Sequence, residues 1–229
     1  MATAIVTGSG RGIGRETAVL LAKHGVNVVV CSRTQDEIDD TVEAIKKTHA
    51  GVLGVRCDVS VSTQVDRLVK KTVEKFGGVD ILINNAGIFT VKKLADTTEK
   101  EWDEILAVNL KSAFLCCKTA LPYMLRNNAG TIINVSSGAG KAGFDSLSAY
   151  CASKFGMMGL TESLAWEVAS HSVRAMAICP GEVATRMQES DPEYYKENID
   201  TMLKPEQVAA KIVDMIFDGK YRNGQSIDI

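Results

Sequence analysis

The chain has 229 residues, of which 45% are hydrophobic, and a formal net charge of −2 at pH 7. This length allows a substantial core, and we expect one domain over residues 1–229. The near-neutral charge, with basic residues scattered along the chain, gives no electrostatic footprint for nucleic acid. Six cysteines and three histidines show no metal-ligand spacing. We therefore expect no metal site, and core thiols in a reducing compartment.

The first seven residues lack the basic and long apolar regions of a signal peptide. They are instead typical of a strand that enters a glycine turn. No apolar run approaches membrane-spanning length. We expect a cytoplasmic protein with no membrane partner.

Short apolar, β-branched runs alternate along the chain with segments of helical periodicity. This alternation predicts an α/β fold with a doubly wound parallel sheet of seven strands flanked by helices. Thr98 and Glu101 form a capping box before one helix, and Pro205 suits the first turn of another. The strands are expected at residues 3–7, 26–31, 52–56, 80–84, 131–135, 173–179 and 225–229.

The first expected strand runs into a glycine-rich turn, residues 7–14, that opens a helix. Glycines let the backbone turn tightly and approach a pyrophosphate, whose charge is met by the helix N-terminus. Tight strand-helix connections also use glycine for packing, so the turn alone leaves both interpretations open. Its spacing, with Gly8, Gly12 and Gly14, differs from the GxGxxG of larger dehydrogenases.

Polar or small residues follow several later strands. They are Asp58 and Val59 after the third, Asn84-Asn-Ala-Gly87 after the fourth, Ser137 after the fifth, and Pro180-Gly181 with Thr185 after the sixth. Asp58 could also cap a helix, and Ser137 could be an ordinary turn residue. Asn109 lies in the helix after the fourth strand, where it could also cap or kink that helix.

Tyr150 and Lys154 stand four residues apart in an expected helix, so both side chains point from one face. A phenol with a pKa of about 10 is a poor acid or base at neutral pH. A nearby ammonium favours the phenolate, and we expect Lys154 to bring the pKa of Tyr150 closer to the working range. By itself the pair could equally be a surface lysine beside a half-buried tyrosine.

Taken together, these motifs resemble the short-chain dehydrogenase/reductase family, with its TGxxxGxG and NNAG patterns and its Asn-Ser-Tyr-Lys tetrad. The resemblance covers roughly residues 3–185 and implies a Rossmann-type fold. It also implies that Tyr150 donates a proton to a substrate carbonyl oxygen in reduction and accepts it in oxidation. Lys154 would favour the tyrosinate and hold the nicotinamide ribose, Ser137 would hydrogen-bond the developing alkoxide, and Asn109 would hold a relay water.

The residue at the end of the second strand bears on the choice of nicotinamide cofactor. An acidic residue there would bind a ribose 2′-hydroxyl and repel a phosphate, but this chain has Ser32 followed by Arg33. Arg33 and Arg11 supply cations for a phosphate, so NADP(H) is favoured over NAD(H). The cofactor-binding residues that the resemblance implies are Gly8, Ser9, Arg11, Gly12, Ile13, Gly14, Ser32, Arg33, Asp58, Val59, Asn85, Ala86, Gly87, Tyr150, Lys154, Pro180, Gly181, Val183 and Thr185.

The substrate is expected beyond the carboxyl ends of the strands, under a substrate-binding lid at residues 186–204. In overall look the chain is nearest to the 3-oxoacyl-[acyl-carrier-protein] reductases of the family. It departs from them at two positions where they tend to carry arginine, here Asn128 and His171, and its lid has more acidic than basic residues. We therefore favour a small carbonyl or alcohol substrate, with the carrier-protein activity as the alternative. Lys141 could contact an anionic substrate group.

A different class of function is a module that senses NADP(H) without turnover. Such a module predicts a damaged reaction centre, whereas Asn109, Ser137, Tyr150 and Lys154 are all present. The helices that contain Phe114 and Phe155 are apolar over more than one stripe. The resemblance makes them an interface, and we expect a homodimer or homotetramer.

Overall fold

A computed structural model of the chain describes residues 1–48, 51–188 and 192–229. At its centre is a seven-stranded sheet with the strand order β3-β2-β1-β4-β5-β6-β7, in which neighbouring strands pair in parallel. The expected Rossmann-type fold class is thereby confirmed. The strands are β1 (Thr3–Thr7), β2 (Asn27–Ser32), β3 (Val52–Arg56), β4 (Ile81–Asn84), β5 (Gly130–Val135), β6 (Val173–Cys179) and β7 (Ser226–Asp228).

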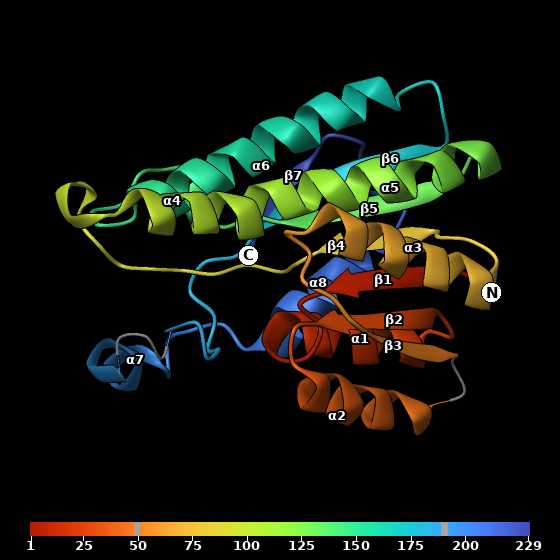
Figure 1. The fold of residues 1–229 in the computed structure, drawn as a ribbon, viewed down its shortest axis with the longest axis horizontal. Coiled ribbons are helices and arrows are strands. Elements are labelled where there is room, and N and C mark those ends of the chain that lie inside the picture. Colours follow the sequence, from red (N-terminus) through yellow and green to blue (C-terminus); the bar gives the residue numbers. More distant parts are fainter. Residues whose placement is uncertain (49–50, 189–191) are drawn as a thin grey trace.

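Helices cover both faces of the sheet (Figure 1). One face carries α1 (Gly12–Lys23), α2 (Gln35–Lys46) and α8 (Pro205–Phe217), and the other carries α3 (Ser62–Phe76), α4 (Glu99–Leu106), α5 (Ser112–Asn127) and α6 (Ser148–Glu167). In β1, Ile5 packs into one core, and Ala4 and Val6 pack into the other. Successive side chains of a strand point to opposite faces, so a strand covered on both sides is apolar throughout.

The strand order reverses at β1, which lies between β2 and β4. Val6 is in register with Val30 on one side and with Ile83 on the other, so the three strands end close together. In doubly wound sheets the binding crevice lies outside the carboxyl ends of the strands at this reversal. The turns that follow β1, β2 and β4 therefore meet at one edge of the sheet.

Local signals set several helix boundaries as predicted. The Glu101 backbone N–H donates to the Thr98 hydroxyl, the Thr98 backbone N–H donates to the Glu101 carboxylate at 2.8 Å, and Pro205 lies in the first turn of α8. Between α4 and α5 the chain forms a π-helical turn, η2 (Ala107–Lys111), which periodicity did not predict. The continuous helical stretch Glu99–Asn127 is long and apolar enough to cross a membrane, contrary to the expectation that no apolar run approaches this length. Half of its most apolar window is buried inside the protein, and a core helix of a soluble protein passes the same test.

The segment after β6 leaves the sheet and returns to α8. Val183 and Leu203 pair in an isolated parallel bridge, and the Ala184 N–H donates to the Leu203 carbonyl at 2.9 Å. These bonds tie the two ends of the predicted lid together, while α7 (Pro192–Asn198) extends away from the sheet in Figure 1. Glu189 and Asp191, two of the acidic lid residues, lie outside the described residues.

Candidate active site

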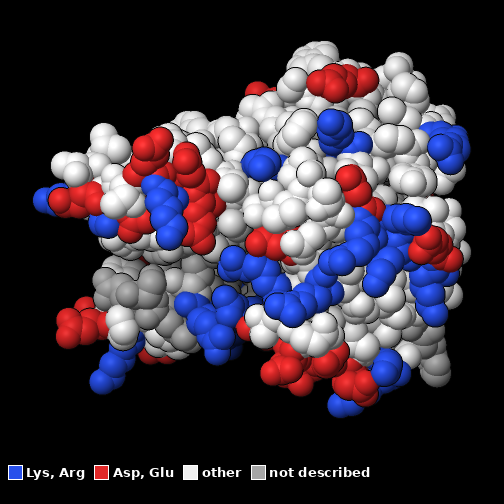
Figure 2. Space-filling model, viewed as in Figure 1, with Lys and Arg blue, Asp and Glu red and all other residues white. Residues whose placement is uncertain are grey.

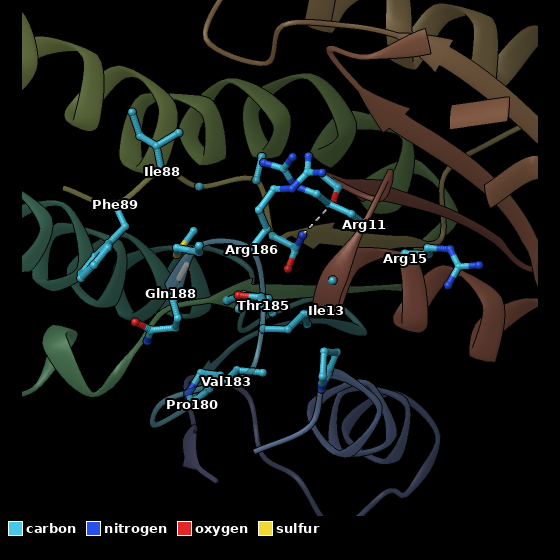
Figure 3. Close-up of a pocket in the computed structure, with 18 of the residues that line it drawn as sticks. Arg11, Ile13, Arg15, Ile88, Phe89, Pro180, Val183, Thr185, Arg186 and Gln188 are labelled. Atoms are coloured by element: carbon cyan, nitrogen blue, oxygen red, sulfur yellow. Dashed lines mark hydrogen bonds between the residues drawn. The ribbon is translucent and has the colours of Figure 1, made fainter. Parts of the chain in front are cut away.

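A cavity of about 1320 Å³ lies beyond the carboxyl ends of the strands. Figure 3 shows Arg11 and Ile13 from the glycine turn, Phe89 from the segment after β4, and Thr185 from the segment after β6 around this one space. Pockets for a drug-sized ligand are about 300–1,000 Å³. The cavity therefore has room for a dinucleotide together with a substrate.

The glycine turn has a backbone that side chains would not tolerate. Gly8 and Gly12 have φ angles of +65° and +54°, in the left-handed region that glycine adopts readily. A Cβ added at Gly8 would lie 2.9 Å from the Ala86 Cα, and one at Gly14 would lie 2.5 Å from the Gly8 carbonyl oxygen. The turn thus packs closely against the loop after β4 and leaves a narrow backbone surface at the start of α1. This surface fits a pyrophosphate.

Hydrogen bonds join the glycine turn to the loop after β4. The Thr7 hydroxyl accepts from the Asn85 backbone N–H at 3.0 Å, and the Asn85 amide donates to the Thr7 carbonyl at 2.9 Å. Ser9 is fully buried, where its hydroxyl donates to the Val6 carbonyl and accepts from the Cys31 N–H at 2.8 Å. Ser9 therefore connects β1 to β2, and its side chain does not face the cavity.

Three of the four predicted catalytic side chains line the cavity: Ser137, Tyr150 and Lys154. Lys154 is 4% exposed, its Nζ donates to the Val135 carbonyl at 2.8 Å, and it lies 5.5 Å from the centroid of the Tyr150 ring. Phe89 packs edge-on against the same ring at 5.0 Å between centroids. The helical spacing of Tyr150 and Lys154 thus places both at the wall of one cavity, as predicted.

Asn109 lies in η2 and is fully buried outside the cavity lining. Its amide group donates to the Ile88 carbonyl and the Ser153 hydroxyl, each at 3.0 Å, and its carbonyl oxygen accepts from the Ile88 N–H at 2.8 Å. Both amide hydrogens are therefore used inside the protein. Asn109 holds the segment after β4 against α6, and its role towards a relay water stays a prediction.

Burial shifts the pKa values of Tyr150 and Lys154. It raises the pKa of Tyr150 to about 12, which a hydrogen bond with Ser137 opposes, and it lowers the pKa of Lys154 to about 8. The expectation that Lys154 brings the pKa of Tyr150 towards neutrality was wrong for this structure. Desolvation disfavours the charged form of each group, and the spacing of the two residues in the sequence does not show how deeply they are buried.

Most of the predicted cofactor-binding residues line the cavity, and Ser9 and Gly14 do not. Asp58 begins a turn rather than a helix, because its carboxylate accepts from the Ser60 N–H at 3.0 Å and α3 starts later. Lys141 lies outside the lining and forms an ion pair of 2.5 Å with Asp228 in β7, and its contact with an anionic substrate group stays a prediction. The residues that do line it are Gly8, Arg11, Gly12, Ile13, Ser32, Arg33, Asp58, Val59, Asn85, Ala86, Gly87, Tyr150, Lys154, Pro180, Gly181, Val183 and Thr185.

Several charged residues line the cavity that were not predicted to bind the cofactor, among them Glu37 in α2 and Arg186, which was predicted only as the first residue of the substrate lid. The Glu37 carboxylate lies 3.0 Å from Arg11 and 3.6 Å from Arg186, and 3.4 Å from the Ser32 hydroxyl. The only signal in the sequence was the place of Glu37 in the first turn of the helix after β2. Among the described residues, His, Cys, Asp and Glu form no group of three that could hold a metal ion.

Comparisons with known proteins agree with this geometry. The family model of the short chain dehydrogenases matches residues 2–196. The chain is 35% identical to a 3-oxoacyl-[acyl-carrier-protein] reductase of Staphylococcus aureus, over 99% of this chain and 96% of the relative, and 34% identical to one of Thermotoga maritima, over 98% and 94%.

Solved structures with a similar fold include a putative short-chain alcohol dehydrogenase from Sinorhizobium meliloti, with a TM-score of 0.92 and 33% identity over 99% of this chain and 94% of that one. Levodione reductase has a TM-score of 0.94 and 30% identity over 100% of this chain and 95% of that one. With the family model, these likenesses span nearly the whole chain. The chain belongs to the short-chain dehydrogenase family.

Proposed function

We propose that the chain is an oxidoreductase that transfers a hydride between NADP(H) and a carbonyl compound or secondary alcohol, with Tyr150 as the general acid and base. The observation that carries this proposal is that Ser137, Tyr150 and Lys154 line the same cavity as the glycine turn. A nicotinamide dinucleotide bound there would supply or accept the hydride. The glycine turn would hold its pyrophosphate, and Lys154 its nicotinamide ribose.

In the reducing direction, the Tyr150 phenol donates its proton to the substrate carbonyl oxygen, and the Ser137 hydroxyl hydrogen-bonds the same oxygen. The raised pKa of Tyr150 keeps the phenol protonated at neutral pH, which is the state a proton donor needs. The Lys154 ammonium stabilises the phenolate that remains. In oxidation the phenolate takes the proton back.

The preference for NADP(H) is supported by the residues at the end of β2. Ser32 and Arg33 line the cavity together with Arg11, so two guanidinium groups border the space next to Ser32, although that of Arg11 is paired with Glu37. A cytoplasmic location is supported by the six cysteines, which are all buried and unpaired. We further propose one domain for residues 1–229, with residues 186–204 as the substrate lid.

A second candidate is 3-oxoacyl-[acyl-carrier-protein] reductase activity, which the similarity to relatives of that name favours. Asn128 and His171 count against it, because arginines typical of the carrier-docking surface are missing there. The different-class alternative, a module that senses NADP(H) without turnover, leaves the intact group of Ser137, Tyr150 and Lys154 without a role.

The proposed enzyme acts as a homodimer or homotetramer. Phe114 in α5 and Phe155 in α6 are 45% and 46% exposed, on helices that already bury another stripe against the sheet. Exposed aromatic side chains of this size are typical of a surface that a second subunit covers.

The reaction is tested with Tyr150→Phe, which removes the proton donor and keeps most of the packing. We expect the turnover of small ketones, followed by NADPH absorbance, to fall by about 10²- to 10⁴-fold, with NADPH binding retained. Tyr123→Phe, on α5 outside the cavity lining, is the matched control. Unchanged turnover in Tyr150→Phe would contradict the assignment.

The same assay separates the two substrate classes. A 3-oxoacyl group is offered once on an acyl carrier protein and once on a short thiol. A much higher kcat/KM for the carrier-bound form would establish the second candidate. Equal values, together with faster reduction of small ketones, support the small carbonyl substrate.

A further inference from the structure

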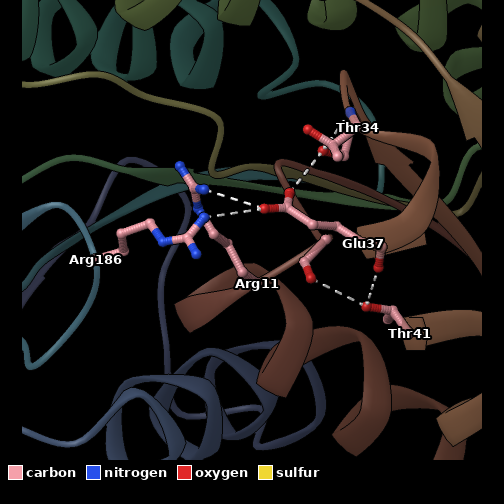
Figure 4. Close-up of polar contacts among 7 residues, drawn as sticks. Arg11, Thr34, Glu37, Thr41 and Arg186 are labelled. Carbon is pink, nitrogen blue, oxygen red and sulfur yellow. Dashed lines mark hydrogen bonds and ion pairs between the residues drawn. The ribbon is translucent and has the colours of Figure 1, made fainter. Parts of the chain in front are cut away.

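A small ion-pair cluster lies at one end of the cavity, where the glycine turn, α2 and the segment after β6 meet. Its central residue is Glu37: one carboxylate oxygen lies 3.0 Å from Arg11 Nη1 and 3.6 Å from Arg186 Nη1. Figure 4 shows both guanidinium groups directed at this oxygen. The other carboxylate oxygen lies 3.4 Å from the Ser32 hydroxyl. Three separate segments of the chain therefore share one carboxylate.

The backbone around Glu37 holds it in this place. The Thr41 hydroxyl lies 3.0 Å from the Glu37 carbonyl oxygen and 3.3 Å from the Gly10 carbonyl oxygen, which ties α2 to the glycine turn. A Cβ at Gly10 would lie 2.8 Å from the Glu37 Cβ and 2.9 Å from its carboxylate. The TGxxxGxG pattern leaves position 10 free, yet only glycine lets Glu37 lie against the turn.

The position of the Glu37 carboxylate bears on which dinucleotide the cavity binds. An acidic residue that ends the second strand of such a sheet binds the adenosine ribose hydroxyls and disfavours a 2′-phosphate. Ser32 holds that position in this chain, but Glu37 brings a carboxylate to within 3.4 Å of the Ser32 hydroxyl from the following helix. The residue type at the end of β2 therefore does not by itself decide the charge of the site where the adenosine ribose would bind.

Arg11 and Arg186 are exposed enough to exchange the Glu37 carboxylate for another anion. The Arg11 and Arg186 side chains are 56% and 65% exposed, and that of Glu37 is 23% exposed. Ion pairs with this much solvent contribute only about 0.2–1 kcal/mol each. A phosphate offers three acceptor oxygens and nearly two negative charges, which suit the forked donors of arginine. Figure 2 shows Lys and Arg side chains across the middle of this face and over the part where α3 lies, with acidic side chains beside them.

We propose that Glu37 and Arg186 determine the selectivity between NADP(H) and NAD(H), because a 2′-phosphate competes with the Glu37 carboxylate for Arg11 and Arg186. This inference rests on the proposed function, since it assumes that a nicotinamide dinucleotide binds in the cavity. Glu37 lowers the affinity for the 2′-phosphate by repulsion and by occupying both guanidinium groups, and Arg186 raises it. Because Arg186 directly follows Thr185, the lid segment takes part in cofactor recognition.

The test is calorimetric binding, which needs no turnover. The ligands are NADP⁺, NAD⁺, adenosine 2′,5′-bisphosphate and adenosine 5′-monophosphate. Glu37→Gln should bind the two 2′-phosphorylated ligands about tenfold more tightly, with NAD⁺ affinity unchanged or reduced. Arg186→Gln should act in the opposite direction and weaken the 2′-phosphorylated ligands about fivefold, with little effect on adenosine 5′-monophosphate.

Asp36→Asn is the matched control, because it removes the same charge from the neighbouring, exposed position of α2, outside the cavity lining. An equal gain in Asp36→Asn and Glu37→Gln would overturn the inference, since a general charge effect would then explain both. So would unchanged selectivity in Glu37→Gln. If the unaltered protein binds neither dinucleotide, the proposed function itself fails, which is a different outcome from a failure of the Glu37 role alone.

Discussion

Lys154 is a buried charged side chain, and its replacement by methionine measures how much this burial lowers the free energy of unfolding. Lys154 is 4% exposed and has one hydrogen bond from Nζ, to the Val135 carbonyl. Methionine has a similar length without the charge. We expect Lys154→Met to lose activity and yet to be at least as stable as the unaltered protein at neutral pH, because the variant no longer buries an ammonium group.

The size of the effect follows from the pKa. Burial lowers the pKa of Lys154 from 10.5 to about 8. At about 1.4 kcal/mol for each pH unit, the folded protein bears a cost of about 3 kcal/mol to keep this ammonium charged at neutral pH. Loss of the hydrogen bond leaves the Val135 carbonyl without this donor, which offsets about 1–3 kcal/mol. The net change in the free energy of unfolding is thus about 0–2 kcal/mol in favour of the variant.

The pH dependence gives the sharper measurement. Between about pH 8 and pH 10.5 the folded protein has released the Lys154 proton and the unfolded chain still holds it, so the stability of the unaltered protein rises with pH. From pH 8 to pH 10 this contribution amounts to about 2 kcal/mol. Urea unfolding across this range should show the rise in the unaltered protein relative to Lys154→Met, because other groups cancel in the difference.

Lys100→Met, at an exposed position of α4, is the control and should keep the pH profile of the unaltered protein. Parallel profiles for the unaltered protein and Lys154→Met would refute the reasoning. They would mean that Lys154 keeps its ordinary pKa in the folded state, so that desolvation does not dominate at this site.

Two further predictions concern the turn and the assembly. Gly12→Ala forces a side chain into a φ of +54°, so we expect it to lower the free energy of unfolding by about 1–2 kcal/mol, measured as a lower melting temperature, and to weaken dinucleotide binding. Gly159→Ala is the control, and it should be neutral or stabilising because the space around the added Cβ is open. Phe155→Ser should shift the sedimentation coefficient towards that of a monomer, and Phe217→Ser, on α8, should not; a monomeric unaltered protein at micromolar concentration would contradict the oligomer.

The strand positions followed from the sequence because both faces of this sheet are covered. A parallel strand between two helical layers is apolar throughout, so runs such as those in β1 and β2 stand out from the periodic segments between them. The capping hydrogen bonds between Thr98 and Glu101 likewise join residues only three positions apart. Signals of this kind depend on a few adjacent residues and can be read without the fold.

Much of the candidate site was predictable for a related reason. The carboxyl ends of parallel strands meet at one edge, so residues recognised after separate strands, such as Ser137 and Thr185, line one cavity. Tyr150 and Lys154 share a face by helical spacing alone. The side chain of Asn109 was placed less well, because its partners Ile88 and Ser153 lie far from it in the sequence.

The residue types along the chain were enough to indicate the alternating fold and the glycine turn, because each depends on local spacing. The group of Ser137, Tyr150 and Lys154 was singled out by the resemblance to the short-chain dehydrogenase/reductase family, since spacing alone left other interpretations open. Only the tertiary structure determined the pKa values and the ion pairs at the site. Burial reversed the expected direction of the pKa of Tyr150, and packing brought Glu37 and Arg186 to Arg11 from two other segments. Desolvation and ion pairing depend on distances in space between residues remote in sequence, and those distances exist only in the folded chain.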